Sequence, residues 1–503
     1  MNRKRTKIVF LLYFFLVIPG LFFLVEQNMG FFIDRSLSKQ NINVESTGAD
    51  FDLFSRSVSF DTVRFSNPSF GEIYCTNLKV NKIDLLSVLP SFGFHAQSIS
   101  VDSLLITVDM TATDSLDMGR DKGKKKPMKF EVDQLDIGYG LVDMYDKEAN
   151  HLTFNFQAKT LNYNSVEGID QGVFTIQNLV YDLIQDYSTI KVDSLSLNIE
   201  EDNLMISSVQ WKSLLTRREF VRKFPFQKDQ IDLEIPRIKM SGMNLSQMNL
   251  EGGVRCRLVV LDSCTLKTFR DKQLPRPEKP DVKLLADMIK GTAFRFGIDT
   301  VKITNTNITH HENYPPSNES GSIPFTNLYA TIYDLSSVGE APIRLDAQAT
   351  VLAQAKLKAR FELNASPKPS HVRGTLSPID MVRANQMSVP AAGLEILTGQ
   401  LLHMDFDFKY TDDRSYGVMN MHYEDLQFKI INPDTHDQNI KQGVGTFIAN
   451  TFKVRTNNTP DMILYREGKI AFERDKKKAV FGYWWQSVLS GIKSSVGVDK
   501  KNG

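Results

Sequence analysis

The feature that most constrains the fold is an eight-residue pattern that recurs along the chain. Two apolar residues in alternation precede an aspartate and a Ser, Thr or Gln, and two further apolar residues in alternation follow. The pattern surrounds six aspartates: Asp61, Asp102, Asp133, Asp193, Asp262 and Asp299. Apolar residues at every second position are typical of a β-strand with one buried face. Because the copies are unequally spaced, the sequence predicts a mainly β protein without a strict solenoid period.

Each copy also predicts an irregularity in its strand. Successive side chains of a strand alternate between its two faces, and Ile99 and Val101 are out of phase with Leu104 and Ile106. One extra residue at Asp102–Ser103, as a β-bulge or tight corner, would bring both pairs to one face. Asp and Ser suit such a position because their short side chains bond to nearby backbone. The alternative is that Asp-Ser and Asp-Thr are common loop dipeptides and that some copies arise by chance.

If the copies share one apolar surface that no second layer packs against, that surface needs something to cover it. We expect these side chains to line it: Phe60, Val63, Val101, Leu104, Ile106, Val132, Leu135, Val192, Leu195, Ile298 and Val301.

Composition excludes several classes of function. The chain has 503 residues, 42% of them hydrophobic, and a formal charge of +1. It can therefore bury a core, and it has no global attraction for nucleic acid. Its three cysteines, Cys75, Cys256 and Cys264, are too few for a disulfide scaffold, and none lies in a CxxC motif. We expect them to be packing residues, with no bound metal or cofactor.

An uncharged apolar segment, residues 8–25, predicts a transmembrane helix near the N-terminus. At 1.5 Å per residue it is about 27 Å long, which suits a bilayer core. Basic residues precede it, so residues 1–7 would form a cytoplasmic stub and the rest of the chain would cross the membrane. The alternative, a cleaved signal peptide, would end at small residues, which are lacking here.

The remainder is divided at a proline-rich linker, residues 274–281. We expect an N-terminal β-region at 26–275 and a C-terminal β-region at 276–503. The charged segment 112–129 and the polar segment 310–324 are expected to be exposed loops.

Few stretches are typical of helices. One is 281–290, with Asp281 as its N-cap, and others lie within 379–402. A terminal segment is rich in aromatic and aliphatic residues and is flanked by lysines. It predicts an amphipathic helix at a membrane interface, or alternatively a helix packed over the open end of the sheet. Its apolar residues are Phe481, Tyr483, Trp484, Trp485, Leu489 and Ile492.

Residues that could carry catalysis are scattered. His310, His311 and Glu312 lack the helical HExxH frame of a zinc site and are expected to lie in a loop. No nucleophile elbow or carboxylate dyad is recognisable in the sequence. We therefore predict that the protein is not an enzyme.

Several motifs, most of them C-terminal, resemble AsmA-like proteins of the Gram-negative cell envelope. They are Leu376–Asn385, Leu397–Gly399, Phe406–Tyr410, Gly417–Leu426, Phe481–Lys493 and, near the N-terminus, Ser57–Pro68. The resemblance implies a long curved β-sheet with an apolar groove, anchored in the inner membrane with its bulk in the periplasm. It also implies a role in moving phospholipids between membranes or in outer-membrane assembly and homeostasis, with phospholipids and an envelope protein as partners. The alternative is an envelope scaffold or regulator that carries no lipid.

Overall fold

The computed structural model describes residues 43–67, 71–84, 94–109, 130–164, 168–243, 253–315, 320–430 and 455–498. Among the described residues the protein is mainly β, with 65% of them in strands and four α-helices, which confirms the predicted fold class at this level. The predicted stub at 1–7 and anchor at 8–25 lie outside the described residues, as does the charged segment 112–129. Every helix of the described part is too short or too polar to cross a bilayer.

The chain divides into two compact units. Unit 1 comprises Met1–Val209 and Lys239–Cys256, and unit 2 comprises Gln210–Ile238 and Arg257–Gly503. The linker at 274–281 lies within unit 2.

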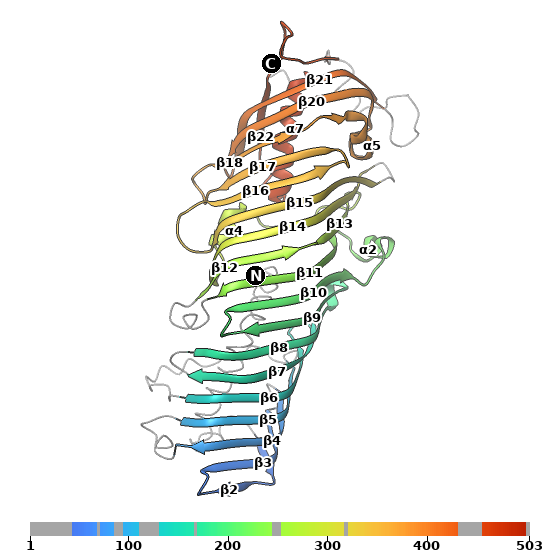
Figure 1. The fold of residues 1–503 in the computed structure, drawn as a ribbon. Helices are drawn as coiled ribbons and strands as arrows, with labels where there is room; N and C mark the ends of the chain where they lie inside the picture. Colours follow the sequence, from blue (N-terminus) through green and yellow to red (C-terminus); the bar gives the residue numbers. More distant parts are fainter. Residues whose placement is uncertain are drawn as a thin grey trace. The chain divides into compact units, whose positions relative to one another are not determined.

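Unit 1 is built from strands that follow one another in sequence order (Figure 1). Neighbours from β3 to β9 pair antiparallel, except that β5 and β6 are parallel, and both β1 and β2 pair with β3. The strands are β1 (Asn43–Thr47), β2 (Asp50–Asp52), β3 (Ser57–Asn67), β4 (Gly71–Ile83), β5 (Phe94–Asp109), β6 (Phe130–Tyr145), β7 (His151–Asn164), β8 (Gly168–Leu183), β9 (Ser188–Asn198) and β10 (Asn203–Ser213), the last of which ends in unit 2.

Unit 2 is also built from paired strands, and β12 pairs with β14 as well as β13 does. Strand β13 pairs parallel with β14 and antiparallel with β11, and the later strands pair antiparallel. The strands are β11 (Asp229–Met243), β12 (Gly253–Asp262), β13 (Thr265–Asp271), β14 (Arg295–Asn313), β15 (Ser320–Ser336), β16 (Ile343–Val351), β17 (Ala355–Leu363), β18 (Ser370–Leu376), β19 (Ile379–Asp380), β20 (Leu394–Tyr410), β21 (Arg414–Ile430) and β22 (Gly468–Glu473). Strands β11 and β12 also contribute residues to unit 1.

The four helices are short apart from the last. They are α2 (Arg217–Lys223), α4 (Leu285–Lys290), α5 (Asn385–Ala392) and α7 (Val480–Val496). The helix predicted at 281–290 begins only at Leu285, so the predicted N-cap Asp281 is wrong. The Val282 N–H donates to the Lys476 carbonyl and Asp281 pairs with Lys477, which holds this stretch extended. Within 379–402, the expected helical part is α5.

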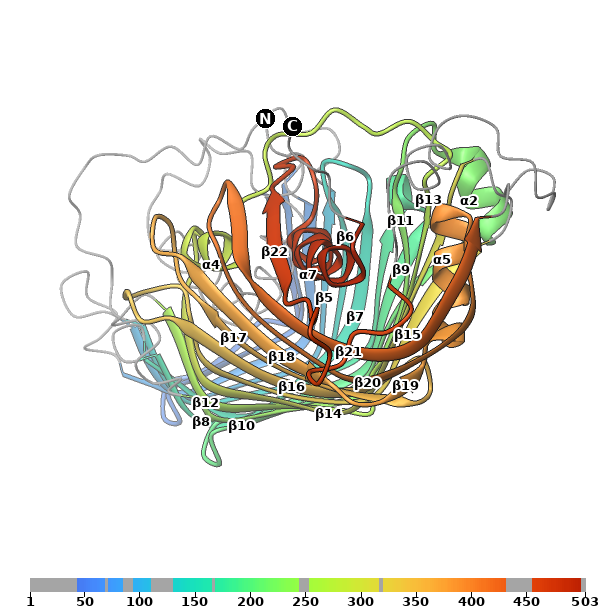
Figure 2. The same ribbon diagram turned by 90° about the horizontal axis from the view of Figure 1, so that it is seen from above.

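The main core of unit 2 lies between its sheet and α7. Strands β16 to β22 curve around this helix (Figure 2), which packs against β22 and β21. Tyr410, Tyr423, Met419 and Ile470 are each no more than 1% exposed. The helix therefore covers one face of the last strands of the sheet.

Candidate functional site

The six aspartates of the recurring pattern mark irregularities of three kinds. At Asp133–Gln134 the register between β6 and β7 shifts by one residue between Val132 and Leu135, so the predicted bulge is confirmed. At Asp262 strand β12 ends, and Ser263 has a positive φ of 58°, so a corner is present there.

At the other four aspartates the strand continues without a register shift, so an extra residue is the wrong explanation. Instead, the facing residue on the neighbouring strand adopts the left-handed conformation. Asn77, with φ of 50°, lies across from Asp61, because Phe60 pairs with Leu78 and Thr62 with Thr76. The same applies across the other pairings: Asn77 with Asp102, Asn178 with Asp193, and Asp334 with Asp299. In both strands, the alternation of side chains between the two faces of the sheet thus changes at the paired positions.

The consequence for the apolar side chains is the one that the sequence predicts. Val63, Cys75 and Val101 form a buried cluster, against which Phe60 and Leu104 pack from either side of their aspartates. A second cluster contains Val80, Ile83 and Ala96, with Val58 and Ile99 packed against it. Leu78 packs against both clusters. In β3, β4 and β5, one apolar face therefore runs past the aspartates.

The residues predicted to line a groove are all buried or half-buried. Phe60, Val63, Val101 and Leu104 share one cluster. Each of the other predicted residues of unit 1 pairs with an apolar residue of a neighbouring strand. The pairs are Val132 with Ala96, Leu135 with Ile99, Ile106 with Ile73, Val192 with Leu179, and Leu195 with Ile176. Ile298 is half-buried and Val301 is buried, both in β14 of unit 2.

The sequence interpretation missed large aromatic side chains of this face in unit 1. Phe154 and Phe156 of β7 and Phe174 of β8 are each at most 3% exposed. The Phe154 and Phe156 ring centroids are 6.2 Å apart, and those of Phe156 and Phe174 are 5.8 Å apart. Strands β7 and β8 lack the aspartate pattern, but the plain alternation Leu-Thr-Phe-Asn-Phe in β7 was the available signal.

In unit 2 part of the opposite face of the sheet is polar, and a cavity of about 280 Å³ lies there over β15 to β18. Its lining includes residues in cross-strand ion pairs, such as Arg360 with Asp346 at 2.6 Å and Arg344 with Asp334 at 2.9 Å. These two ion pairs are exposed.

Clusters of titratable groups also lie outside the apolar face. In unit 1 the potential ligand atoms of His95, Glu131 and Asp133 lie within 4.8 Å of one another, an arrangement able to hold a metal ion that the sequence interpretation did not foresee. All three residues are partly or fully exposed, and the His95 Nε2–Asp133 Oδ1 distance of 3.1 Å already accounts for their closeness.

The other cluster surrounds Glu312 in unit 2. His310, His311 and Glu312 lie in β14, so their expected loop is wrong; β14 extends to Asn313 because it pairs with both β13 and β15. Burial opposes ionisation of Glu312, but hydrogen bonds from His310, Lys272 and Tyr314 outweigh it and lower its pKa to about 2. This group is stabilised as a carboxylate and is not poised to exchange a proton near neutral pH.

The terminal helix α7 divides the predicted membrane-interface residues into two sets. Tyr483 and Trp484 are buried against the sheet, as in the alternative of a packed helix. Phe481 and Trp485 are 71% and 45% exposed. Leu489 and Ile492 are half-buried. Contact of the exposed set with a membrane stays a prediction.

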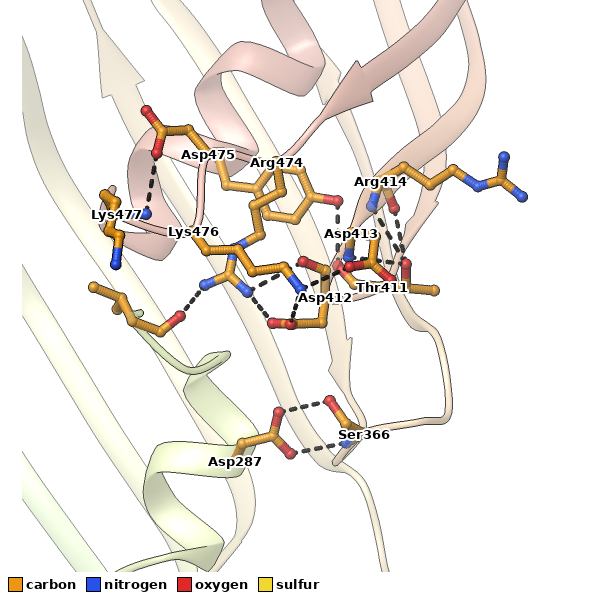
Figure 3. A network of polar contacts seen from close by, with 12 residues as sticks. Asp287, Ser366, Thr411, Asp412, Asp413, Arg414, Arg474, Asp475, Lys476 and Lys477 are labelled. Atoms are coloured by element: carbon orange, nitrogen blue, oxygen red, sulfur yellow. Dashed lines mark hydrogen bonds and ion pairs between the residues drawn. The ribbon is translucent and has the colours of Figure 1, made fainter. Parts of the chain in front are cut away.

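A polar network attaches the start of α7 to the rest of unit 2 (Figure 3). The Arg474 side chain is fully buried and binds the Asp412 carboxylate and the Val282 carbonyl. Lys476 pairs with Asp412 and Asp413 at 2.8 and 2.7 Å, and the Tyr483 hydroxyl donates to the Thr411 carbonyl at 3.2 Å. The network thus joins the β20–β21 turn, α7 and the segment before α4.

Cys75, Cys256 and Cys264 are buried and form no disulfide with one another, as expected of packing residues. Burial raises the pKa of the Cys75 and Cys264 thiols, which disfavours the reactive thiolate. Neither the models of known protein families nor the curated proteins contain a match to this chain.

Proposed function

We propose that this protein is anchored in the inner membrane of a Gram-negative envelope and binds phospholipid acyl chains on its apolar β-face. In this proposal it acts in the periplasm, in transport of lipid between membranes or in assembly of the outer membrane. The observation that supports it most is the merging of Phe60, Val63, Val101 and Leu104 into one cluster across two aspartates. The resemblance to AsmA-like proteins agrees with this reading.

The chemistry of the face suits an acyl chain. Its described members are aliphatic and aromatic, and several of them, such as Phe60, Leu78 and Leu104, are only half-buried. Burying about 14 methylene groups at ~0.8 kcal/mol each gives on the order of 10 kcal/mol per chain. This free energy is comparable with the free energy that an acyl chain loses when it leaves a bilayer.

In unit 2 the same function has a structural limit. Helix α7 covers the face of β21 and β22, with Tyr483 and Trp484 packed into the core there. An acyl chain bound along the sheet of unit 2 would therefore end against α7.

Transfer of a fluorescent phospholipid from vesicles that carry the full chain to acceptor vesicles tests the proposal. Leu104→Asp places a charge on the apolar face, and we expect the transfer rate to fall at least tenfold, because burying a carboxylate beside an acyl chain costs several kcal/mol. Leu105→Asp is the matched control, since it makes the same change one residue along β5 on the other face. We expect it to change the rate less than twofold.

Circular dichroism of both variants establishes that they fold. Equal effects of the two substitutions would contradict the proposal. If the wild-type chain gives no transfer above protein-free vesicles, the result favours the second candidate, an envelope scaffold that carries no lipid.

A further inference from the structure

The apolar face of unit 1 ends at an exposed edge. All residues of β1 and β2, which both pair with β3, are exposed. Phe51 pairs directly with Val58, and Val44 pairs directly with Phe65. Residues directly opposite each other in antiparallel strands lie on the same face. Val44 and Phe51, which are 39% and 54% exposed, therefore continue the apolar face to its last strands.

The turn after β2 adds two more exposed apolar side chains. Leu53 is 68% exposed and Phe54 is 101% exposed. The turn is held in place, because the Asp52 Oδ1 accepts from the backbone N–H of Phe54 at 2.8 Å and of Ser55 at 3.3 Å. The Ile83 N–H also donates to the Arg56 carbonyl, which ties the turn to the end of β4.

We propose that Val44, Phe51, Leu53 and Phe54, here called the apolar rim, contact the hydrocarbon boundary of a lipid bilayer. This inference rests on the proposed function, because it makes the rim the place where an acyl chain passes between bilayer and protein. Through Val44 and Phe51 the rim is continuous with the face that would receive the acyl chain. Transfer of a Leu or Phe side chain from water into hydrocarbon is favourable, so burial of Leu53 and Phe54 would stabilise this contact.

Chain length favours a bilayer over a protein as the occupant. Residues 26–42 connect the apolar segment 8–25 to β1 and span at most ~60 Å when fully extended. A chain anchored through 8–25 therefore keeps the rim within about 60 Å of the membrane, so that the rim can reach the bilayer surface. The neighbouring Asp50 and Asp52 carboxylates give anionic lipids no advantage, so we expect contact with zwitterionic phospholipids.

An environment-sensitive fluorophore at the rim tests this inference in the full chain. The cysteine of the Phe54→Cys variant is labelled with a nitrobenzoxadiazole probe. The native thiols react poorly with this probe because they are buried. The matched control is Ile184→Cys, also in unit 1 at a turn, where the native side chain is 52% exposed. Both proteins are reconstituted into phosphatidylcholine–phosphatidylethanolamine vesicles with or without lipids that carry a nitroxide on the acyl chain.

We expect the emission at position 54 to rise at least threefold on reconstitution and to be quenched by the nitroxide lipids, and position 184 to show neither effect. Emission at position 54 that is insensitive to the nitroxide lipids would overturn the inference. A rise that depends on protein density instead of the lipid quencher would also overturn it, in favour of contact with another chain.

The test separates this inference from the proposed function. Quenching at position 54 together with no effect of Leu104→Asp on transfer would retain the rim contact and reject lipid carriage. The reverse pair of results would reject the rim contact alone.

Discussion

At the residue scale, the aspartates of the recurring pattern have a structural role. The Asn77 side-chain amide donates to the Asp102 Oδ2 at 2.6 Å, and the Thr304 hydroxyl donates to the Asp262 Oδ1 at 2.6 Å. Asn tolerates the left-handed conformation better than most residues with a side chain, which suits Asn77 and Asn178. The facing residue and the aspartate thus stabilise a change of alternation together. This accounts for a polar pair in strands that are otherwise apolar on alternate positions.

Glu312 allows a prediction on stability and pH. Its pKa of about 2 in the folded chain lies below the ordinary value of 4.5, so its carboxylate stabilises the fold above about pH 4.5 and this stabilisation is lost as the pH falls toward 2. Glu312→Gln should lower the free energy of unfolding by on the order of 3 kcal/mol at pH 7. Urea denaturation at pH 7 and pH 3 measures the difference, which should shrink at the lower pH.

Glu340→Gln is the control for this experiment. The Glu340 side chain is 94% exposed, and we expect its substitution to change stability by less than about 0.5 kcal/mol at either pH. A Glu312→Gln effect that is the same at both pH values would show that its carboxylate charge is not the cause.

At the scale of elements, α7 is held close to the sheet by small residues. Ser487, Gly491 and Ser495 are buried, and the Ser487 hydroxyl donates to the Ser415 hydroxyl at 2.8 Å. A Cβ atom at Gly491 would lie 2.8 Å from Ile470 Cγ1 and 2.9 Å from Met419 Cε, and both of these side chains are fully buried. The helix therefore has little freedom to accept a larger residue on this side.

Gly491→Val should weaken the docking of α7. We expect a loss of about 1–3 kcal/mol in the free energy of unfolding, because the added atoms would overpack the core. Gly482→Val in the same helix is the matched control, since a Cβ there meets nothing within 4 Å. Urea denaturation followed by tryptophan fluorescence reports on both, through Trp484 and Trp485. A similar loss for both variants would indicate that helix propensity, and not the contact with the sheet, sets the effect.

Strands were predictable from the sequence to the extent that their signals are local. The alternation of β3, β5, β6, β9 and β14 is visible in the pattern itself. The left-handed residues that face the aspartates were not, because Asn77 and Asn178 are on other strands and their role depends on pairing. The extended stretch before α4 was missed for the same reason, since its partner, Lys476, is remote in sequence.

The terminal helix shows a further limit of sequence reasoning. Its aromatic residues lie on different faces of the helix, so the sequence was compatible with a helix at a membrane interface and with a helix packed on the sheet. Only the placement of β21 and β22 decides that Tyr483 and Trp484 are buried, while Phe481 and Trp485 are exposed.

At the scale of the whole molecule, each unit has an apolar face. In unit 1 the apolar face extends from the exposed residues of β1 and β2 to the aromatic side chains of β7 and β8. In unit 2 the face is covered at its last strands by α7. Under the proposed function, the rim would be a place of lipid entry into unit 1, and within unit 2 a bound acyl chain would end at α7.

This arrangement predicts that the residues of β5 that contact lipid change from odd-numbered to even-numbered positions at Asp102. A photo-reactive amino acid placed in the full chain in living cells should crosslink to radiolabelled phospholipid from Ile99 and Leu104, and not from Ser100, Ser103 or Leu105. An uninterrupted strand would instead group position 99 with 103 and 105, because its faces alternate at every residue. Positions 103 and 105 are therefore internal controls on either side of Leu104. Lipid adducts at 103 and 105 but not at 104, or equal adducts at all five positions, would contradict a one-sided apolar face that is maintained across Asp102.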